Sequence, residues 1–164
     1  MIEIIENFLT DEESSTISSI DVTVYGKRVW EIGQDLDVKV IRSNIKPYIQ
    51  DIIGKYNFPY SSAAELMKYR VGSCSLPHTD GSGSHYDSSG EHKIVTWTKT
   101  GVVLLNDDFE GGDLYFPCLN KRFGKEYKNC LVIFPAGTDS DLYTHGVSPI
   151  TRGTRYTLII RFID

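Results

Sequence analysis

Three side chains could hold one metal ion: His78 and Asp80 in the segment His78-Thr-Asp80, and His145 far downstream. Two imidazoles and one carboxylate on one face of a metal leave open the positions that a non-haem Fe(II) site needs for a bidentate ligand and O2. On a strand, side chains at i and i+2 point the same way, so His78 and Asp80 can reach one ion. Because so short a motif often arises by chance, it predicts a metal site only together with other features.

A cation lies ten residues after His145, at Arg155. The run that follows it, Tyr156–Ile160, is apolar or β-branched on both faces and predicts an interior strand. A buried arginine without a partner is costly, and a guanidinium can hold a carboxylate through two parallel hydrogen bonds. We therefore expect Arg155 to bind an anionic ligand, and we expect Arg152 and Arg161 to be exposed.

The N-terminal part must provide elements that support these residues. Ile2–Leu9 predicts a short strand, and Thr10 followed three residues later by Glu13 is a capping-box start for a helix that ends near Ile20. Isoleucine and valine recur at three- and four-residue steps through 37–56, which predicts a second, amphipathic helix.

From residue 61 onward, short runs of β-branched and aromatic residues alternate with turn residues, which predicts a sandwich or barrel. The fold class is therefore mainly β with N-terminal helices. The small residues of Gly81–Gly90 predict a mobile loop beside the metal motif, a candidate lid. The predicted strands are Glu65–Val71, Lys93–Leu105, Asp113–Phe116, Tyr127–Phe134, Tyr143–Val147 and Thr154–Ile163.

The chain has 164 residues, is 40% hydrophobic and carries a formal net charge of -5. These values predict one folded domain, 1–164, with supporting elements in 1–60 and the β core in 61–164. The acidic balance argues against a nucleic-acid partner. The three cysteines form no CxxC pair, so we expect neither disulfides nor a zinc knuckle. We see no secretory signal, transmembrane span or membrane partner, and expect a cytoplasmic location.

Taken together, the motifs resemble the prolyl 4-hydroxylase-like branch of the 2-oxoglutarate/Fe(II) oxygenases. Order and spacing agree over about one hundred residues, which makes the combination specific although each motif alone is not. The stretches that carry the resemblance are IEIIENFLTDEE (2–13), MKYRVGSCSLPHTD (67–80), LLNDDFEGGDLYFP (104–117), CLVIFPAG (130–137) and HGVSPITRGTRYTLIIRF (145–162).

The resemblance implies a double-stranded β-helix, a distorted jelly roll. It implies Fe(II) at His78, Asp80 and His145, with Arg155 and Tyr69 binding 2-oxoglutarate. The implied reaction uses O2, with ascorbate as a reductant, to hydroxylate an unactivated C–H and release succinate and CO2. The implied partner is a peptide or protein whose proline becomes 4-hydroxyproline. No catalytic residue beyond the metal ligands is implied.

Two positions depart from the resembled family. Ser75 stands where a second tyrosine is frequent, and Arg155 stands where many prolyl 4-hydroxylases have lysine. The second departure keeps the ion pair, because arginine is the better fork for a carboxylate.

Three alternatives remain open. Arg155 and Arg161 stand six apart, which resembles the arginine pair of the oxidative nucleic-acid demethylases. A jelly-roll binding module with a structural metal would bind the ion without 2-oxoglutarate. A zinc hydrolase is the third alternative, although the sequence has no HExxH motif to supply a general base.

Overall fold

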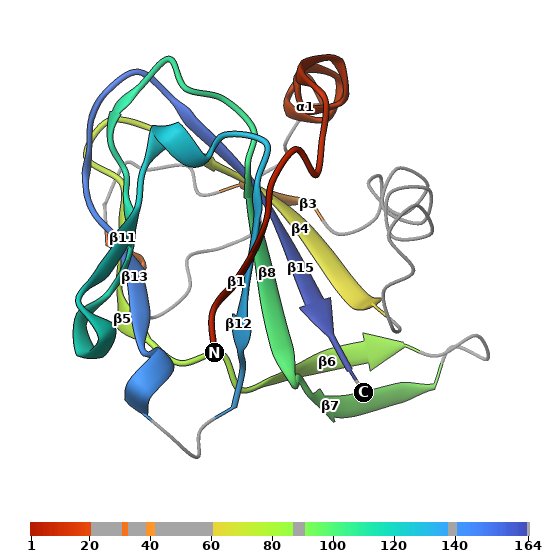
Figure 1. Cartoon of the computed structure of the whole chain (residues 1–164). Coiled ribbons are helices and arrows are strands. Elements are labelled where there is room, and N and C mark those ends of the chain that lie inside the picture. Colours follow the sequence, from red (N-terminus) through yellow and green to blue (C-terminus); the bar gives the residue numbers. More distant parts are fainter. Residues whose placement is uncertain (21–30, 33–38, 42–60, 87–90, 138–140, 164) are drawn as a thin grey trace.

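The computed structural model describes residues 1–20, 31–32, 39–41, 61–86, 91–137 and 141–163, and their strands form two antiparallel sheets that face each other (Figure 1). The first sheet has the order β1 (Glu3–Ile5), β12 (Leu131–Pro135), β8 (Lys99–Leu104), β15 (Arg155–Phe162), β4 (Ser61–Tyr69), β3 (Lys39–Ile41). The second has the order β11 (Lys121–Phe123), β10 (Leu114–Phe116), β13 (His145–Val147), β5 (Cys74–His78), β2 (Glu31–Ile32).

Two further two-stranded antiparallel sheets complete the strands of the described residues. β9 (Glu110–Gly111) pairs with β14 (Ile150–Arg152), and β6 (Ser82–Tyr86) pairs with β7 (His92–Thr96). Single-turn helices lie at η1 (Pro117–Leu119), η2 (Lys125–Tyr127) and η3 (Asp141–Tyr143). An antiparallel two-layer architecture is what the alternating runs in the sequence predict, and the mainly β class is confirmed.

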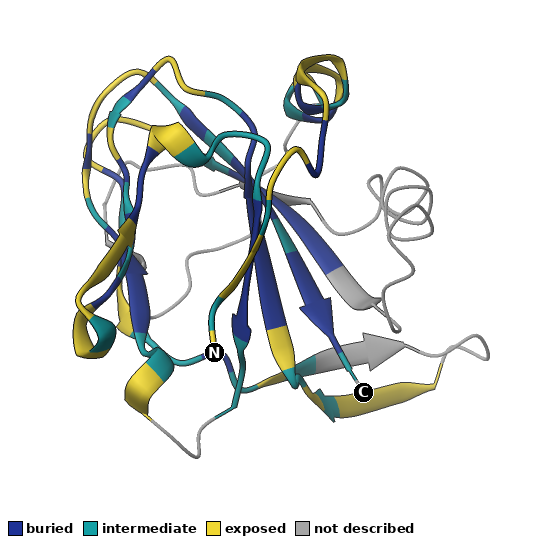
Figure 2. Ribbon diagram, viewed as in Figure 1, coloured by how far each residue is buried: buried dark blue, intermediate teal, exposed yellow. Residues whose placement is uncertain are grey.

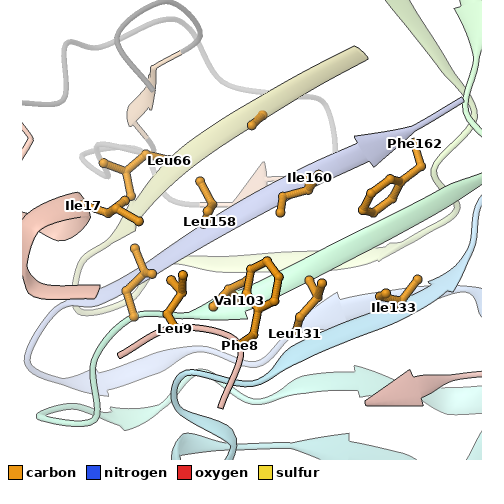
Figure 3. Close-up of a cluster of buried hydrophobic side chains, with 12 residues drawn as sticks. Phe8, Leu9, Ile17, Leu66, Val103, Leu131, Ile133, Leu158, Ile160 and Phe162 are labelled. Carbon is orange, nitrogen blue, oxygen red and sulfur yellow. The ribbon is translucent and has the colours of Figure 1, made fainter. Parts of the chain in front are cut away.

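Strand β15 lies in the interior of the first sheet, between β8 and β4. One of its faces is apolar, and the other carries the two arginines. Because side chains alternate along a strand, Leu158, Ile160 and Phe162 point to the outer face. There they join an apolar cluster with Phe8 and Leu9, which precede the N-terminal helix, and with Ile17 of that helix (Figure 3). Arg155 and Arg161 point to the inner face, toward the second sheet. Figure 2 shows how completely β15 and its neighbours are buried.

Helix α1 (Asp11–Ser18) covers the outer apolar cluster. It begins as the sequence predicts: Thr10 accepts a hydrogen bond from the Glu13 amide, and the Glu13 carboxylate accepts one from the Thr10 amide. The helix ends two residues before the predicted end, and Ile17 is the buried apolar residue of its inner side. The capping box therefore fixes the start of the helix, and one apolar contact holds it to the sheet.

The predicted helix over 37–56 is wrong for Lys39–Ile41, which form β3 and pair with β4 at the edge of the first sheet. Pairing with an exposed sheet edge satisfies the backbone of this segment, and this outweighs the helical spacing of its apolar residues. The remainder of that prediction lies outside the described residues.

The prediction of a loop over Gly81–Gly90 is also wrong for Ser82–Tyr86, which form β6 against β7. The β-branched residues of β7 supply the partner strand, and Gly83 gives room for a large ring. A Cβ at Gly83 would lie 2.2 Å from Cζ2 of Trp97. Residues 87–90 lie outside the described residues.

Candidate metal and anion site

The two candidate histidines face each other across neighbouring strands of the second sheet. His78 on β5 is the register partner of His145 on β13, and the ring centroids lie 4.5 Å apart. Asp80 lies two residues beyond the end of β5, and its backbone carbonyl accepts a hydrogen bond from the Gly137 amide. One ligand atom of each of His78, Asp80 and His145 lies within 4.8 Å of the others, so residues 65 positions apart meet at one point.

Both imidazoles direct Nε2 toward Asp80 and Nδ1 toward a backbone carbonyl. The Nδ1 atom of His78 lies 2.7 Å from the Leu76 carbonyl oxygen, and that of His145 lies 3.0 Å from the Tyr143 carbonyl oxygen. A carbonyl can only accept, so each Nδ1 carries the proton and each Nε2 keeps its lone pair. A hydrogen bond from the second ring nitrogen to a backbone carbonyl is the arrangement that orients metal-binding histidines.

The charges of the three groups suit a metal ligand set. Burial lowers the pKa of His145 to about 4 against the opposing effect of Asp80, so this imidazole is neutral at physiological pH. Burial raises the pKa of Asp80, but the Arg161 charge and other partners outweigh it, and the pKa lies below its usual value. The rings of Phe134 and Phe116 lie 4.6 and 5.6 Å from the His145 ring and restrict its rotation.

The expectation that Arg161 is exposed is wrong. Its side chain is 3% exposed, and Nη1 lies 2.9 Å from Oδ2 of Asp80. Thr100 on β8 donates a second hydrogen bond to the same oxygen, at 2.7 Å. The even spacing from Arg155 was the signal in the sequence, because residues six apart on a strand share a face. Arg152 is exposed as expected and pairs with Glu110.

Arg155 lines the same pocket as the two candidate histidines, and it is buried as the sequence predicts. It is 2% exposed, its Nη1 donates to Thr157 Oγ1 at 2.5 Å, and its Cζ lies 5.2 Å from the Tyr69 ring centroid. Within the described part of the chain, no carboxylate lies within 4.0 Å of this guanidinium, and its Nε has no hydrogen-bond partner. Burial lowers the pKa of Arg155, yet arginine stays protonated in proteins. Among the described residues, the site therefore holds a buried cation that no carboxylate contacts directly.

The pocket itself is a space of about 410 Å³ between the two sheets, counting its open mouth. Arg155, Thr157 and Tyr69 line it, and so do the two histidines. Ser75 is buried and lines the same pocket, at the position where the resembled family frequently has a second tyrosine. The pocket can thus receive a molecule with an anionic end and a second end that ligates a metal.

Comparison with known proteins gives a consistent result. No family model matches the sequence. A curated protein of Acanthamoeba polyphaga mimivirus, named "putative prolyl 4-hydroxylase", is 26% identical over 124 residues, which cover 68% of this chain. The chain spans about half the length of that relative, 50%.

Two solved structures share the fold. The viral collagen prolyl hydroxylase vCPH of Paramecium Bursaria Chlorella virus-1, in its 2OG complex, aligns with a TM-score of 0.64 and 15% identity over 98% of this chain and 94% of that one. A Trichoplax adhaerens prolyl hydroxylase, in complex with a hypoxia inducible factor peptide fragment, aligns with a TM-score of 0.65 and 17% identity over 99% and 83% of the two chains. The predicted jelly roll and the resemblance to prolyl hydroxylases are confirmed.

Proposed function

We propose that this chain is an Fe(II)- and 2-oxoglutarate-dependent dioxygenase of the prolyl 4-hydroxylase type, built as a single domain over 1–164. In this proposal His78, Asp80 and His145 hold the iron, and Arg155 holds the distal carboxylate of 2-oxoglutarate. The observation that carries it is one pocket lined by His78, His145 and Arg155. The ligand atoms of the two histidines converge with that of Asp80, and Arg155 has no carboxylate partner among the described residues.

The donor set fits Fe(II). Two neutral imidazole nitrogens and one ionised carboxylate make a facial triad, which leaves three positions of an octahedral ion for a bidentate cosubstrate and O2. The buried and neutral His145 and the ionised Asp80 supply these protonation states without a change on metal binding. When bound, the iron, 2-oxoglutarate and O2 together supply the oxidising chemistry, with succinate and CO2 as co-products.

The anion end fits a dicarboxylate. Arg155 offers a planar fork of donors, one of which is already fixed by Thr157, so the guanidinium is oriented before the ligand enters. The Tyr69 ring lies against the guanidinium, and we propose that its hydroxyl adds a hydrogen bond to 2-oxoglutarate. The apolar lining residues exclude water around this charge pair and so strengthen it; they include Met67, Val102, Leu114, Val147 and Ile159.

The proposed substrate is a proline-containing peptide that becomes 4-hydroxyproline. Support comes from the mimivirus relative, which is named putative prolyl 4-hydroxylase, and from the Trichoplax prolyl hydroxylase, which was solved in complex with a peptide fragment. Ascorbate serves as the external reductant in the proposed reaction. Nothing in the chain's net charge favours a nucleic-acid substrate over a peptide.

One observation favours a second candidate, oxidative demethylation of nucleic acid. Arg161 stands six residues after Arg155 and is paired with Asp80, so the two arginines lie in one pocket. A third possibility, a binding module with a structural metal, lacks a role for Arg155, which contacts no carboxylate among the described residues. Assays with different primary substrates separate these candidates.

The test is succinate release from 2-oxoglutarate under air, with Fe(II) and ascorbate, in the presence of a proline-rich peptide or a methylated oligonucleotide. We expect iron-dependent succinate that increases with the peptide, together with hydroxyproline in the recovered peptide. His145→Ala should abolish it, whereas His92→Ala, which changes an exposed histidine, should not. Succinate release that increases with the oligonucleotide and not with the peptide would favour nucleic-acid demethylation over prolyl hydroxylation. Protein that binds Fe(II) but not 2-oxoglutarate would contradict the oxygenase proposal.

A further inference from the structure

The geometry points to a positioning role for Arg161 and Thr100: together they hold one oxygen of Asp80 so that the carboxylate presents only its other oxygen, Oδ1, to the metal. This inference rests on the proposed metal site and goes beyond it, because it concerns residues outside the ligand triad. It makes Asp80 a monodentate ligand by construction.

The two oxygens of Asp80 are unequal in their hydrogen bonding. Oδ2 accepts from Thr100 Oγ1 at 2.7 Å and from Arg161 Nη1 at 2.9 Å. No hydrogen bond to Oδ1 is found within the described part of the chain. Because a carboxylate oxygen has two lone pairs, the two donors occupy Oδ2 and leave Oδ1 for a ligand.

The positions of the two imidazoles do not determine which oxygen of Asp80 faces the metal. His78 Nε2 lies 3.7 Å from Oδ1, and His145 Nε2 lies 3.6 Å from Oδ2, so each oxygen has one histidine nearby at almost the same distance. Only the donors on the far side of Asp80 distinguish the two oxygens. The asymmetry therefore comes from Thr100 and Arg161.

Thr100 and Arg161 also fix each other. Arg161 Nη1 donates to Thr100 Oγ1 at 3.2 Å, which engages the hydroxyl as an acceptor and directs its single proton to Asp80. Thr100 is 0% exposed and Arg161 is 3% exposed, so water does not compete for these bonds. The three side chains form a closed, buried triangle.

An aromatic ring covers the guanidinium of Arg161. Its Cζ lies 4.8 Å from the Trp97 ring centroid, and the Trp97 amide donates to the carbonyl of Gly81, the residue after Asp80. Gly83 leaves space for the Trp97 ring. The base of the β6–β7 pair thus holds Arg161 in place against Asp80.

The consequence concerns the number of coordination positions. A bidentate Asp80 would leave an octahedral ion two positions, which is one too few for a chelating 2-oxo acid and O2. A monodentate Asp80 leaves three. Fixing Oδ2 is therefore expected to favour binding of 2-oxoglutarate as well as binding of the metal.

The test uses the full chain loaded with Co(II), which avoids turnover and has a visible spectrum that reports coordination. Thr100→Val and Arg161→Met each remove one donor, and Arg161→Lys keeps a charge. Thr98→Val and Arg152→Met are matched controls, because Thr98 donates to the Phe162 carbonyl and Arg152 is exposed. Calorimetry gives the Co(II) affinity and the 2-oxoglutarate affinity of each loaded protein.

We expect Thr100→Val and Arg161→Met to lower Co(II) affinity by roughly 10- to 100-fold, the usual effect of losing an outer-shell partner. At saturating Co(II) both variants should show an altered Co(II) spectrum and weaker 2-oxoglutarate binding, and Arg161→Lys should restore part of both. A merely destabilised fold would leave the saturated spectrum unchanged.

Variants that bind Co(II) and 2-oxoglutarate like the wild type, with the wild-type spectrum, would overturn the inference while the metal site stands. If Arg161→Met fails to fold, the nearly isosteric Thr100→Val decides the question alone. A wild-type protein that binds no Co(II) would instead overturn the proposed site, and this inference with it.

Discussion

The guanidinium of Arg155 lies among buried groups and meets no carboxylate within the described residues. The sequence could predict this side chain, because an arginine that opens an apolar strand has few ways to be solvated. The histidine pair and Asp80 were equally visible as ligand types. Thr100 was not, since a single hydroxyl in a strand carries no signal of what it will contact. Arg161 was wrongly predicted to be exposed, because its burial depends on pairing with Asp80, 81 positions away.

Replacing Arg155 should weaken 2-oxoglutarate binding specifically. Arg155→Met removes a buried charge partner, which costs about 2–5 kcal/mol, or roughly 30- to 4000-fold in affinity. Arg155→Lys should lose less, because it keeps the charge but not the fork. Calorimetry on Mn(II)-loaded protein measures both, with the exposed Arg152→Met as control. Unchanged 2-oxoglutarate affinity in Arg155→Met would show that the anion binds elsewhere.

At the scale of elements, Asn129 adds polar contacts to the apolar contact of Ile17 that holds helix α1 to the core. Its side chain accepts from Ser14 at 2.5 Å and donates to Asp11 at 2.8 Å, while its backbone bonds Leu9 and Leu104. The capping box made the helix predictable, because its signal is local. These side-chain bonds were not predictable, because Asn129 is 115 residues from Ser14 and 118 residues from Asp11. β3 and β6 were missed because strand pairing decides them: β3 pairs with β4 further along the chain, and β6 pairs with its neighbour β7.

Asn129→Ala should destabilise the protein by about 1–3 kcal/mol, because it leaves the buried Ser14 hydroxyl without its acceptor and strains the backbone at φ 64°. Asn120→Ala is the matched control, since Asn120 has φ 48° but an exposed side chain. Urea unfolding gives both values. An equal loss in the two variants would mean that the backbone strain alone accounts for the effect.

The first turn of α1 should make a pH-dependent contribution to stability. The hydrogen bond from Asn129, followed by that from Lys128 and its charge, lowers the pKa of Asp11 below its ordinary 3.8. A depressed pKa in the folded state means that the stabilisation is present above the unfolded value and is lost as pH falls through the folded value.

The urea midpoint of Asp11→Asn should therefore lie below that of the wild type at neutral pH, and the difference should shrink as the pH is lowered past 3.8. Since Asp11 is exposed, the difference should also shrink with added salt. A difference that is constant across pH would assign the effect to the amide substitution and not to the charge.

At the scale of the whole molecule, one sheet serves two separate purposes. The outer face of β15 carries the apolar cluster beneath α1, and its inner face carries the arginines of the pocket. The alternating runs in the sequence predicted two packed layers, and the comparisons confirm the jelly roll. The order of strands was not predictable from periodicity, because alternation specifies which side chains share a face and not which strand lies alongside. No helix within the described residues is long and apolar enough to cross a membrane.

A core substitution on the outer face should separate stability from binding. Leu158→Ala, at a position 0% exposed, should lower the free energy of unfolding by about 2–5 kcal/mol. The 2-oxoglutarate affinity of the folded, metal-loaded protein should stay within a factor of about two, because the Leu158 side chain lies on the face of β15 opposite the pocket and contacts none of the proposed ligand-binding groups. Unfolding and calorimetry on the same preparation test this; a large loss of affinity well below the unfolding transition would show that the two faces are coupled.

The most direct measurement of the central claim is calorimetric titration of 2-oxoglutarate into the protein with Mn(II) and again with a chelator. The account predicts one binding event per chain that requires the metal and disappears in His145→Ala, because the ligand joins the triad to Arg155. Binding of equal strength with the chelator would contradict this account, as would a protein that binds Mn(II) but shows no binding of 2-oxoglutarate.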